Sequence, residues 1–421
     1  MRYRALTLLA LSLLARSALA QEGALPALKE AAKQAPSSLE AQAALGRALV
    51  KAGRLKEADA QMAVIARLSK GSIEALYESM QARLAGDNYA KARAGCQELI
   101  KKDENAVLSQ VCMARAFLVW RRSSRAFEHI DKALARDPES YDALLVLADA
   151  RRIQGEHDAA VEAYEHALRV RPTSAEAELG LGLSLALQNK PADALAALRK
   201  ANQLDPSDPD VQFELGTRLQ GKDAVSLLQQ AVAGRPGWAQ AELALAMAEL
   251  QAGDAASAEA LLQAFLKRNP KDPIAIAHHG AALVGLGRYQ DAEPVLRKAL
   301  EAVPNDYDTS FALAQLYEHT NRYEEAFSQY RNAADLKRES PVPLIAAAKL
   351  GLSLKRPSLS SALLDKALER APHSAEVLAL SADALAARGD AKAARERYKS
   401  ALKGEGPLDR AMVQKRLAEL Q

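Results

Sequence analysis

The sequence contains few aromatic residues and few residues that favour strands. Phe, Trp and Tyr make up 5% of its 421 residues, and the apolar content is mostly Ala and Leu. Both are good helix formers, whereas β-branched and aromatic side chains are enriched in strands. The chain is also longer than the about 250–300 residues at which a single hydrophobic core stops growing. We therefore expect an all-α protein made of several domains or of a repeat array.

Long hydrophobic runs are absent after the amino terminus. The run 5–15 follows two arginines, and the small residues Ala18 and Ala20 occupy the two positions that a signal peptidase reads. A membrane span needs about 20 apolar residues, so this run is too short to be one. The pattern is typical of a signal peptide over 1–20, cleaved before Gln21. We expect an exported protein, periplasmic in a bacterium or secreted, with no transmembrane segment in the mature chain.

An excess of charge of either sign is absent too. The whole chain has 56 Lys and Arg against 53 Asp and Glu. Removal of the expected signal peptide takes away three arginines and no acid, which leaves 53 bases and 53 acids. A nucleic-acid partner would require a basic face. We therefore expect no nucleic-acid partner.

What the chain does have is a period. Proline recurs at Pro138, Pro172, Pro206, Pro236, Pro270, Pro304 and Pro372, at intervals of 34, 34, 30, 34, 34 and 68 residues. A small residue precedes each proline by twelve positions: Ala126, Ala160, Ala194, Ala224, Ala258, Ala292 and Ser360. A 34-residue period of helical stretches, each followed by a proline that cannot continue the helix, predicts a tandem array of helix pairs.

The repeat resembles the tetratricopeptide repeat (TPR), whose pattern reads W-x2-L-G-x2-Y, then A-x3-F, then A and P. In residues 141–174 the matching positions hold Leu147, Ala148, Ala160, Tyr164, Ala167 and Pro172. The Trp of the pattern is missing in every repeat, and the sixth repeat is four residues short. The resemblance implies an all-α fold, a right-handed α-solenoid of about eleven helix-turn-helix repeats, that binds another protein and catalyses nothing.

The period also sets the expected boundaries. A lead-in helix within 21–38 precedes the array, and a capping helix within 407–421 follows it. The eleven repeats between them are 39–72, 73–106, 107–140, 141–174, 175–208, 209–238, 239–272, 273–306, 307–340, 341–374 and 375–406. Position 8 of most repeats is Gly or Ala, which lets two helices approach closely. Position 15 is often Gly or Asn, which suits a left-handed turn after the first helix.

In TPR proteins the first helix of each repeat lines a concave groove with positions 2, 5, 9 and 12. The resemblance therefore implies a nearly continuous apolar row at position 5, which we expect to bind the partner: Tyr77, Val111, Leu145, Leu179, Phe213, Leu243, Phe311 and Ile345. At position 9, Arg115 and Asp149 add charge to this groove. The Lys and Asn clamp by which relatives hold a carboxylate tail is absent.

Two classes of partner fit this groove. The first is a segment of an envelope or secretion protein, which makes the chain an interaction scaffold. The second is a glycan, which makes it an accessory subunit of a polysaccharide assembly or secretion machine. Glycan grooves require exposed aromatics and carboxylates, whereas the row is mostly aliphatic, so the sequence favours a protein.

Cys96 and Cys112 are the two cysteines of the chain. They fall on neighbouring helices, at position 24 of repeat two and position 6 of repeat three. In an oxidising compartment such a pair forms a disulfide. Two buried thiols that act as small apolar side chains are the alternative, and the sequence leaves both open.

Patterns of catalytic and metal sites are missing. The sequence has no phosphate-binding loop and no Gly-x-Ser-x-Gly elbow. The adjacent His278 and His279 point to different faces of a helix and cannot chelate one metal by themselves. The basic run 121–125 falls on a turn, where a solvated surface is the simpler interpretation and a contact with an acidic partner the other. We expect no enzyme activity, no cofactor and no metal.

Overall fold

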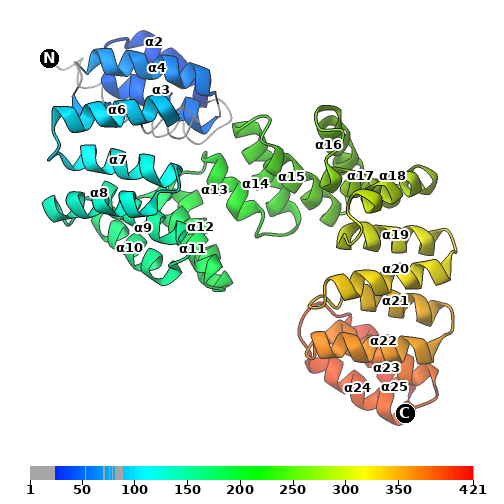
Figure 1. Cartoon of the computed structure of the whole chain (residues 1–421). Coiled ribbons are helices and arrows are strands. Elements are labelled where there is room, and N and C mark those ends of the chain that lie inside the picture. Colours follow the sequence, from blue (N-terminus) through cyan, green and yellow to red (C-terminus); the bar gives the residue numbers. More distant parts are fainter. Residues whose placement is uncertain are drawn as a thin grey trace. The chain divides into compact units, whose positions relative to one another are not determined.

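The computed structural model describes residues 24–420, apart from 53, 70–71, 75, 78 and 81–88. The expected signal peptide and its cleavage site lie outside the described residues. The chain divides into two compact units, Met1–Ala248 and Glu249–Gln421. In each unit, α-helices joined by short turns pack against their neighbours in the sequence (Figure 1). The fold is an all-α solenoid, as the sequence predicts.

The helices of the first unit follow the 34-residue period. They are α2 (Ala24–Gln34), α3 (Leu39–Lys51), α4 (Leu55–Leu68), α6 (Tyr89–Lys102), α7 (Val107–Val119), α8 (Ser123–Arg136), α9 (Tyr141–Ile153), α10 (His157–Val170), α11 (Ala175–Leu187), α12 (Pro191–Leu204), α13 (Pro209–Gly216), α14 (Gly221–Gly234) and α15 (Ala239–Gln251), which ends just past the boundary. The shortened sixth repeat has an eight-residue first helix, α13.

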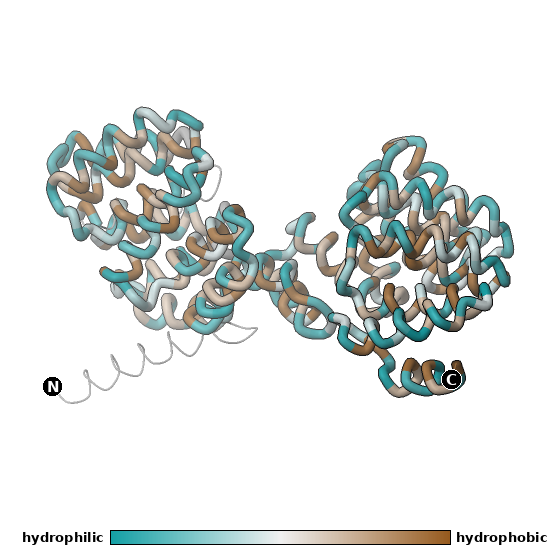
Figure 2. Tube along the Cα trace, turned by 90° about the horizontal axis from the view of Figure 1, so that it is seen from below, coloured by the Kyte–Doolittle hydropathy of each residue, from teal (hydrophilic) through white to brown (hydrophobic). Residues whose placement is uncertain are grey.

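The second unit continues the same alternation. Its helices are α16 (Ala255–Arg268), α17 (Pro273–Gly285), α18 (Tyr289–Ala302), α19 (Tyr307–His319), α20 (Tyr323–Leu336), α21 (Val342–Ser353), α22 (Pro357–Arg370), α23 (Ala375–Ala387), α24 (Ala391–Lys403) and α25 (Arg410–Glu419). Hydrophilic and hydrophobic residues are interspersed along the helices (Figure 2). Second helices such as α8 and α18 have one apolar and one polar face, whereas first helices such as α11 are mostly apolar.

Helix starts are encoded by capping side chains. Ser140, Ser174 and Asp272 each accept a hydrogen bond from the backbone amide three residues further on, at 3.4, 3.1 and 2.9 Å. Such caps satisfy amides that have no partner inside the helix. Helix ends are encoded at position 15, where Gly155 and Asn189 adopt positive φ, 81° and 58°. These two signals fix where the chain reverses.

Close packing explains the small residue at position 8. A Cβ atom on Gly182 would lie 2.8 Å from Cγ of Leu198, so the glycine lets α11 approach α12. In repeat two the large and the small residue are exchanged between the two helices. Met80 occupies position 8 of the first helix and is 2% exposed. The room is provided by Gly95 of α6, where a Cβ atom would lie within 1.9 Å of the Met80 sulfur.

Candidate functional site

The position-5 side chains differ in exposure along the array. Tyr77, Val111 and Leu145 are buried, with 5%, 1% and 1% of their surface exposed. Ile345 is buried as well. Those that remain half-buried are Leu179, Phe213, Leu243 and Phe311. In repeats two to four and in repeat ten, the position-5 side chains therefore belong to the core of the free protein, and the expected row is accessible only in part.

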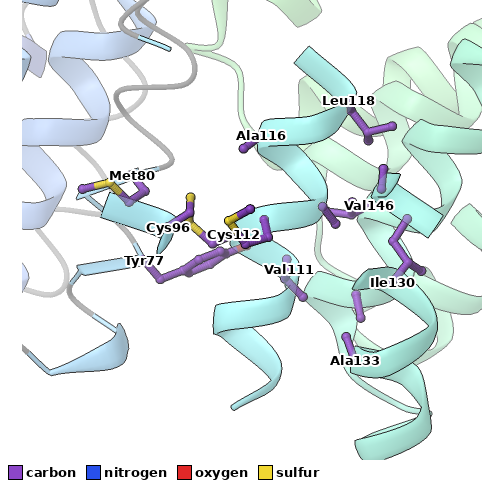
Figure 3. Packing of buried hydrophobic residues seen from close by; sticks show 14 of the residues in the cluster. Tyr77, Met80, Cys96, Val111, Cys112, Ala116, Leu118, Ile130, Ala133 and Val146 are labelled. Atoms are coloured by element: carbon purple, nitrogen blue, oxygen red, sulfur yellow. A yellow bond between two sulfur atoms is a disulfide. The ribbon is translucent and has the colours of Figure 1, made fainter. Parts of the chain in front are cut away.

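Contacts between repeats cause this burial. Tyr77 packs in one hydrophobic cluster with Val111, Cys112 and Val146, so side chains of repeats two, three and four meet (Figure 3). The hydroxyl of Tyr77 also donates a hydrogen bond to Oδ1 of Asp142, at 3.2 Å. Repeat two thus reaches repeat four directly, and the side chains of the protein itself fill this part of the concave face.

Arg115 lies in the same network. Its Nη1 is 3.6 Å from Oε1 of Glu176, and its side chain is 19% exposed. Burial opposes the charged form, but Tyr77, Glu176, Asp149 and Asp142 outweigh it and raise the pKa of Arg115 above its usual value. Its Nε is buried without a hydrogen-bond partner among the residues that the structure describes. The charge of Arg115 is thus compensated from within the protein.

Asp149 is engaged in the same way. It accepts a hydrogen bond from the hydroxyl of Tyr164 at 2.5 Å and lies 3.5 Å from Nη2 of Arg152. Burial, with Asp149 adding to it, raises the pKa of Tyr164, so the hydroxyl stays protonated and donates. Both charged side chains that the sequence assigned to the groove are therefore bound by neighbours in the array.

Repeats five to seven carry a different surface. Five of the six side chains at positions 5 and 9 of these repeats are apolar and half-buried: Leu179, Leu183, Phe213, Leu243 and Met247. The sixth, Thr217, is polar and exposed. None of these five side chains can ionise. We call these five residues the apolar stretch, and it lies within the first unit.

An aromatic residue that the sequence analysis missed supports this stretch. The rings of Phe213 and Trp238 are 4.6 Å apart. The guanidinium of Arg235 lies 4.3 Å from the Trp238 ring and forms two hydrogen bonds with Asp210, at 2.9 and 2.7 Å. Trp238 directly follows the Pro236-Gly237 turn that closes the short sixth repeat. Pro236 ends the one interval of 30 residues in the period, and this irregularity is the signal that could have located Trp238.

Cys96 and Cys112 are joined by a disulfide in the structure, with their Cα atoms 5.4 Å apart. Both are buried, at 0% and 1% exposure. The bond connects α6 of repeat two to α7 of repeat three next to Tyr77 (Figure 3). It fixes the two repeats whose side chains fill the concave face.

The part of the chain that the structure describes contains no group of three or more His, Cys, Asp and Glu side chains arranged to hold a metal ion. His278 is buried, and Nε2 of His279 lies 3.9 Å from Glu259. No described helix combines the length and the apolar character that a membrane span requires.

Comparison with known proteins identifies the family. One tetratricopeptide repeat family matches residues 113–168, 154–209 and 279–341, and a second tetratricopeptide repeat family matches residues 220–278. Together these matches cover just over half of the chain. The chain belongs to the TPR superfamily. TPR arrays act as protein-interaction scaffolds, so the first helices of this TPR protein are its candidate binding elements.

Individual relatives are distant. The chain is similar to the BBSome complex member BBS4 of Bos taurus, with 24% identity over 172 residues, 40% of this chain and 33% of that protein. It is 30% identical to Superkiller complex protein 3 of Mus musculus over 184 residues, 42% of this chain and 12% of that protein. The matches span a third or less of these relatives. The solved structure of yeast Tom70 covers 91% of this chain and 95% of its own, with 11% identity and a TM-score of 0.48.

Proposed function

We propose that this TPR protein is a non-catalytic scaffold of the cell envelope that binds an apolar segment of a partner protein on repeats five to seven. The apolar stretch is the observation that carries the proposal. In repeats three and four, Arg115 and Asp149 are already engaged within the protein. In repeats five and seven the corresponding side chains, Leu183 and Met247, are apolar and half-buried, and in repeat six the corresponding Thr217 carries no charge.

The physical argument is one of burial. Covering a half-exposed aliphatic side chain with a partner removes apolar area from water, and complete burial of a Leu contributes roughly 1.5–3 kcal/mol. Phe213 already contacts Trp238. Leu179 and Leu243 hold the same repeat position on α11 and α15. A partner segment with two or three apolar side chains would therefore find its anchoring contacts at Leu179 and Leu243.

The test is a pair of matched variants. Leu179→Ser with Leu243→Ser should abolish capture of the partner from envelope extracts, as measured by quantitative mass spectrometry of co-purified proteins. Leu204→Ser is the control, because Leu204 is an aliphatic residue of α12 with 36% exposure outside the apolar stretch. Undiminished capture by the double variant would refute the proposal. Loss of helical circular dichroism would instead show that the two leucines belong to the core.

We also propose that the protein reaches the envelope by cleavage before Gln21. The basic start, the short apolar run and the small residues Ala18 and Ala20 support this. Intact mass spectrometry of protein from the producing cells tests it. A mature chain that begins at Gln21 is the expected result, and a cytosolic protein that retains Met1 would contradict it.

A further inference from the structure

Three neighbouring helices of the first unit end in an exposed aliphatic residue. Val119, Ile153 and Leu187 are the last residues of α7, α9 and α11. Their exposed fractions are 38%, 52% and 58%. Helix α9 packs against both α7 and α11. A short turn reverses the chain after each helix, so these helices run in one direction with their ends side by side, about 8–10 Å between axes.

The fold itself does not require aliphatic residues at this place. Single exposed aliphatic side chains are ordinary on protein surfaces, so the comparison with other repeats decides whether these three are special. The other first helices that the structure describes from end to end finish in small or polar residues: Lys51, Gly216, Gln251, Gly285, His319, Ser353 and Ala387. Apolar ends are thus confined to repeats three, four and five.

Uncompensated positive charge lies beside these ends. Arg121 and Arg122 follow α7 directly and are exposed. No acid that the structure describes forms an ion pair with either of them. Arg121 adopts φ of 53°, the left-handed conformation that ends the first helix of a repeat. Trp120 precedes them, half-buried, with the guanidinium of Arg93 5.1 Å from its ring.

The acids of this edge are mostly engaged by other residues. Glu128 lies 3.6 Å from Arg125, and Glu156 pairs with Arg151. Asp158 accepts a hydrogen bond from Gln188 at 2.7 Å. Further along, the exposed Lys190 and Asp193 offset each other's charge. Gln188 is neutral and leaves the charge of Asp158 in place, so the positive charge of Arg121 and Arg122 exceeds the remaining acid of this edge by one.

We propose that this edge, formed by Val119, Ile153, Leu187, Arg121 and Arg122, docks a protein segment that carries aliphatic and acidic side chains. The three aliphatic side chains would be buried against those of the segment. The two guanidinium groups match carboxylates, which they bind bidentately. An anionic membrane surface is the alternative partner that the cross-linked product distinguishes. The site is at helix ends, outside the apolar stretch, and does not depend on the proposed function.

The experiment places a photo-crosslinking amino acid at residue 153 of the full-length protein in the producing cells. Mass spectrometry then identifies the cross-linked peptide. The expected product is a segment of another protein with net negative charge and several aliphatic residues. Its yield should fall several-fold when Arg121→Glu and Arg122→Glu are combined, because reversed charges repel the carboxylates. A cross-linker at residue 204, on α12, should not give this product.

A charge-matched control separates specific from general electrostatics. Lys298→Glu with Lys366→Glu changes the net charge equally at two exposed sites of the second unit and should leave the yield unchanged. Leu179→Ser with Leu243→Ser should also leave it unchanged, so that failure here and failure of the proposed function are distinguishable. Cross-links to lipid, to a second copy of this chain or to a basic segment would overturn the proposal, as would no cross-link.

The fold of the charge variants is checked separately. Circular dichroism and urea unfolding of the purified Arg121→Glu, Arg122→Glu protein should match those of the wild type, because both side chains are exposed. If that variant does not fold, Arg121→Gln with Arg122→Gln removes the same charges without reversal. A cross-link yield that is unchanged by a folded variant of either kind would overturn the proposal.

Discussion

The hydroxyl of Tyr77 in repeat two donates a hydrogen bond to Oδ1 of Asp142 in repeat four, 65 residues further along the chain, at 3.2 Å. Burial is the main reason that the pKa of Tyr77 lies above its usual value; Arg115 opposes the shift and Asp142 adds to it. The hydroxyl therefore stays protonated and remains a donor. This contact ties together repeats that are not adjacent in the sequence.

Removal of this hydroxyl should destabilise the first unit. We expect Tyr77→Phe to lower the free energy of unfolding by about 1.5–3 kcal/mol, the range for a hydrogen bond to a charged group. Urea unfolding measures the change. Tyr289→Phe is the control, since its hydroxyl forms no hydrogen bond with any residue that the structure describes. Equal effects of the two substitutions would show that the Tyr77–Asp142 contact contributes nothing.

Reduction of the disulfide should have a local effect. Cys96 and Cys112 are 16 residues apart, and closing a loop of about that length contributes roughly 3 kcal/mol in the chain-entropy model. We expect Cys112→Ser to increase hydrogen exchange in α6 and α7 and to leave the second unit unchanged. Peptide mapping without reductant should find both cysteines bonded in protein from an oxidising compartment. Two free thiols in that material would contradict the prediction.

Addition of one methyl group at Gly280 should destabilise the second unit. A Cβ atom there would lie 2.4 Å from Cδ2 of Leu296. Ala is the better helix former by about 1 kcal/mol, but overpacking costs typically 1–3 kcal/mol. We therefore expect Gly280→Ala to lower the unfolding free energy in wild type and to raise it in a Leu296→Ala background. The same sign in both backgrounds would show that the contact with Leu296 is not the cause.

Acid should weaken the second unit through His278. Burial lowers the pKa of His278, whereas Asp308, Asp306 and Asp272 oppose the shift. Below about pH 6.5, the usual value for histidine, the unfolded state binds a proton that the folded state does not, so stability falls as the pH drops. The decrease is about 1.4 kcal/mol for each unit of pKa difference and ends below the lowered pKa.

The measurement compares unfolding of the second unit at about pH 7.5 and about pH 5. His278→Gln should reduce the loss of stability between them. His373→Gln is the control, because that side chain is exposed and lies in the same unit. If both variants lose as much stability on acidification as the wild type, His278 is not the group that titrates.

Much of the fold could be predicted from the sequence because its determinants are local. Proline spacing, small residues at position 8 and serine or aspartate caps each act within a few residues of the chain. The helices consequently begin where these signals occur, as at Tyr141, Ala175 and Pro273. The left-handed turn at position 15 could not be predicted where the residue is neither Gly nor Asn. Arg121 and Lys355 adopt positive φ at this position.

The candidate site could be predicted only in part. The sequence alone determined that this chain is a helical repeat array. Only the tertiary structure decided which position-5 residues of the first helices are accessible. Tyr77, Val111 and Leu145 have the same repeat position as Leu179 and Leu243, yet the first three are buried. Tyr77 and Val111 lie in a cluster that joins repeats two to four, and Leu145 lies in one formed with α10 and α11. Contacts between distant repeats depend on how the helices stack, and no local pattern records that.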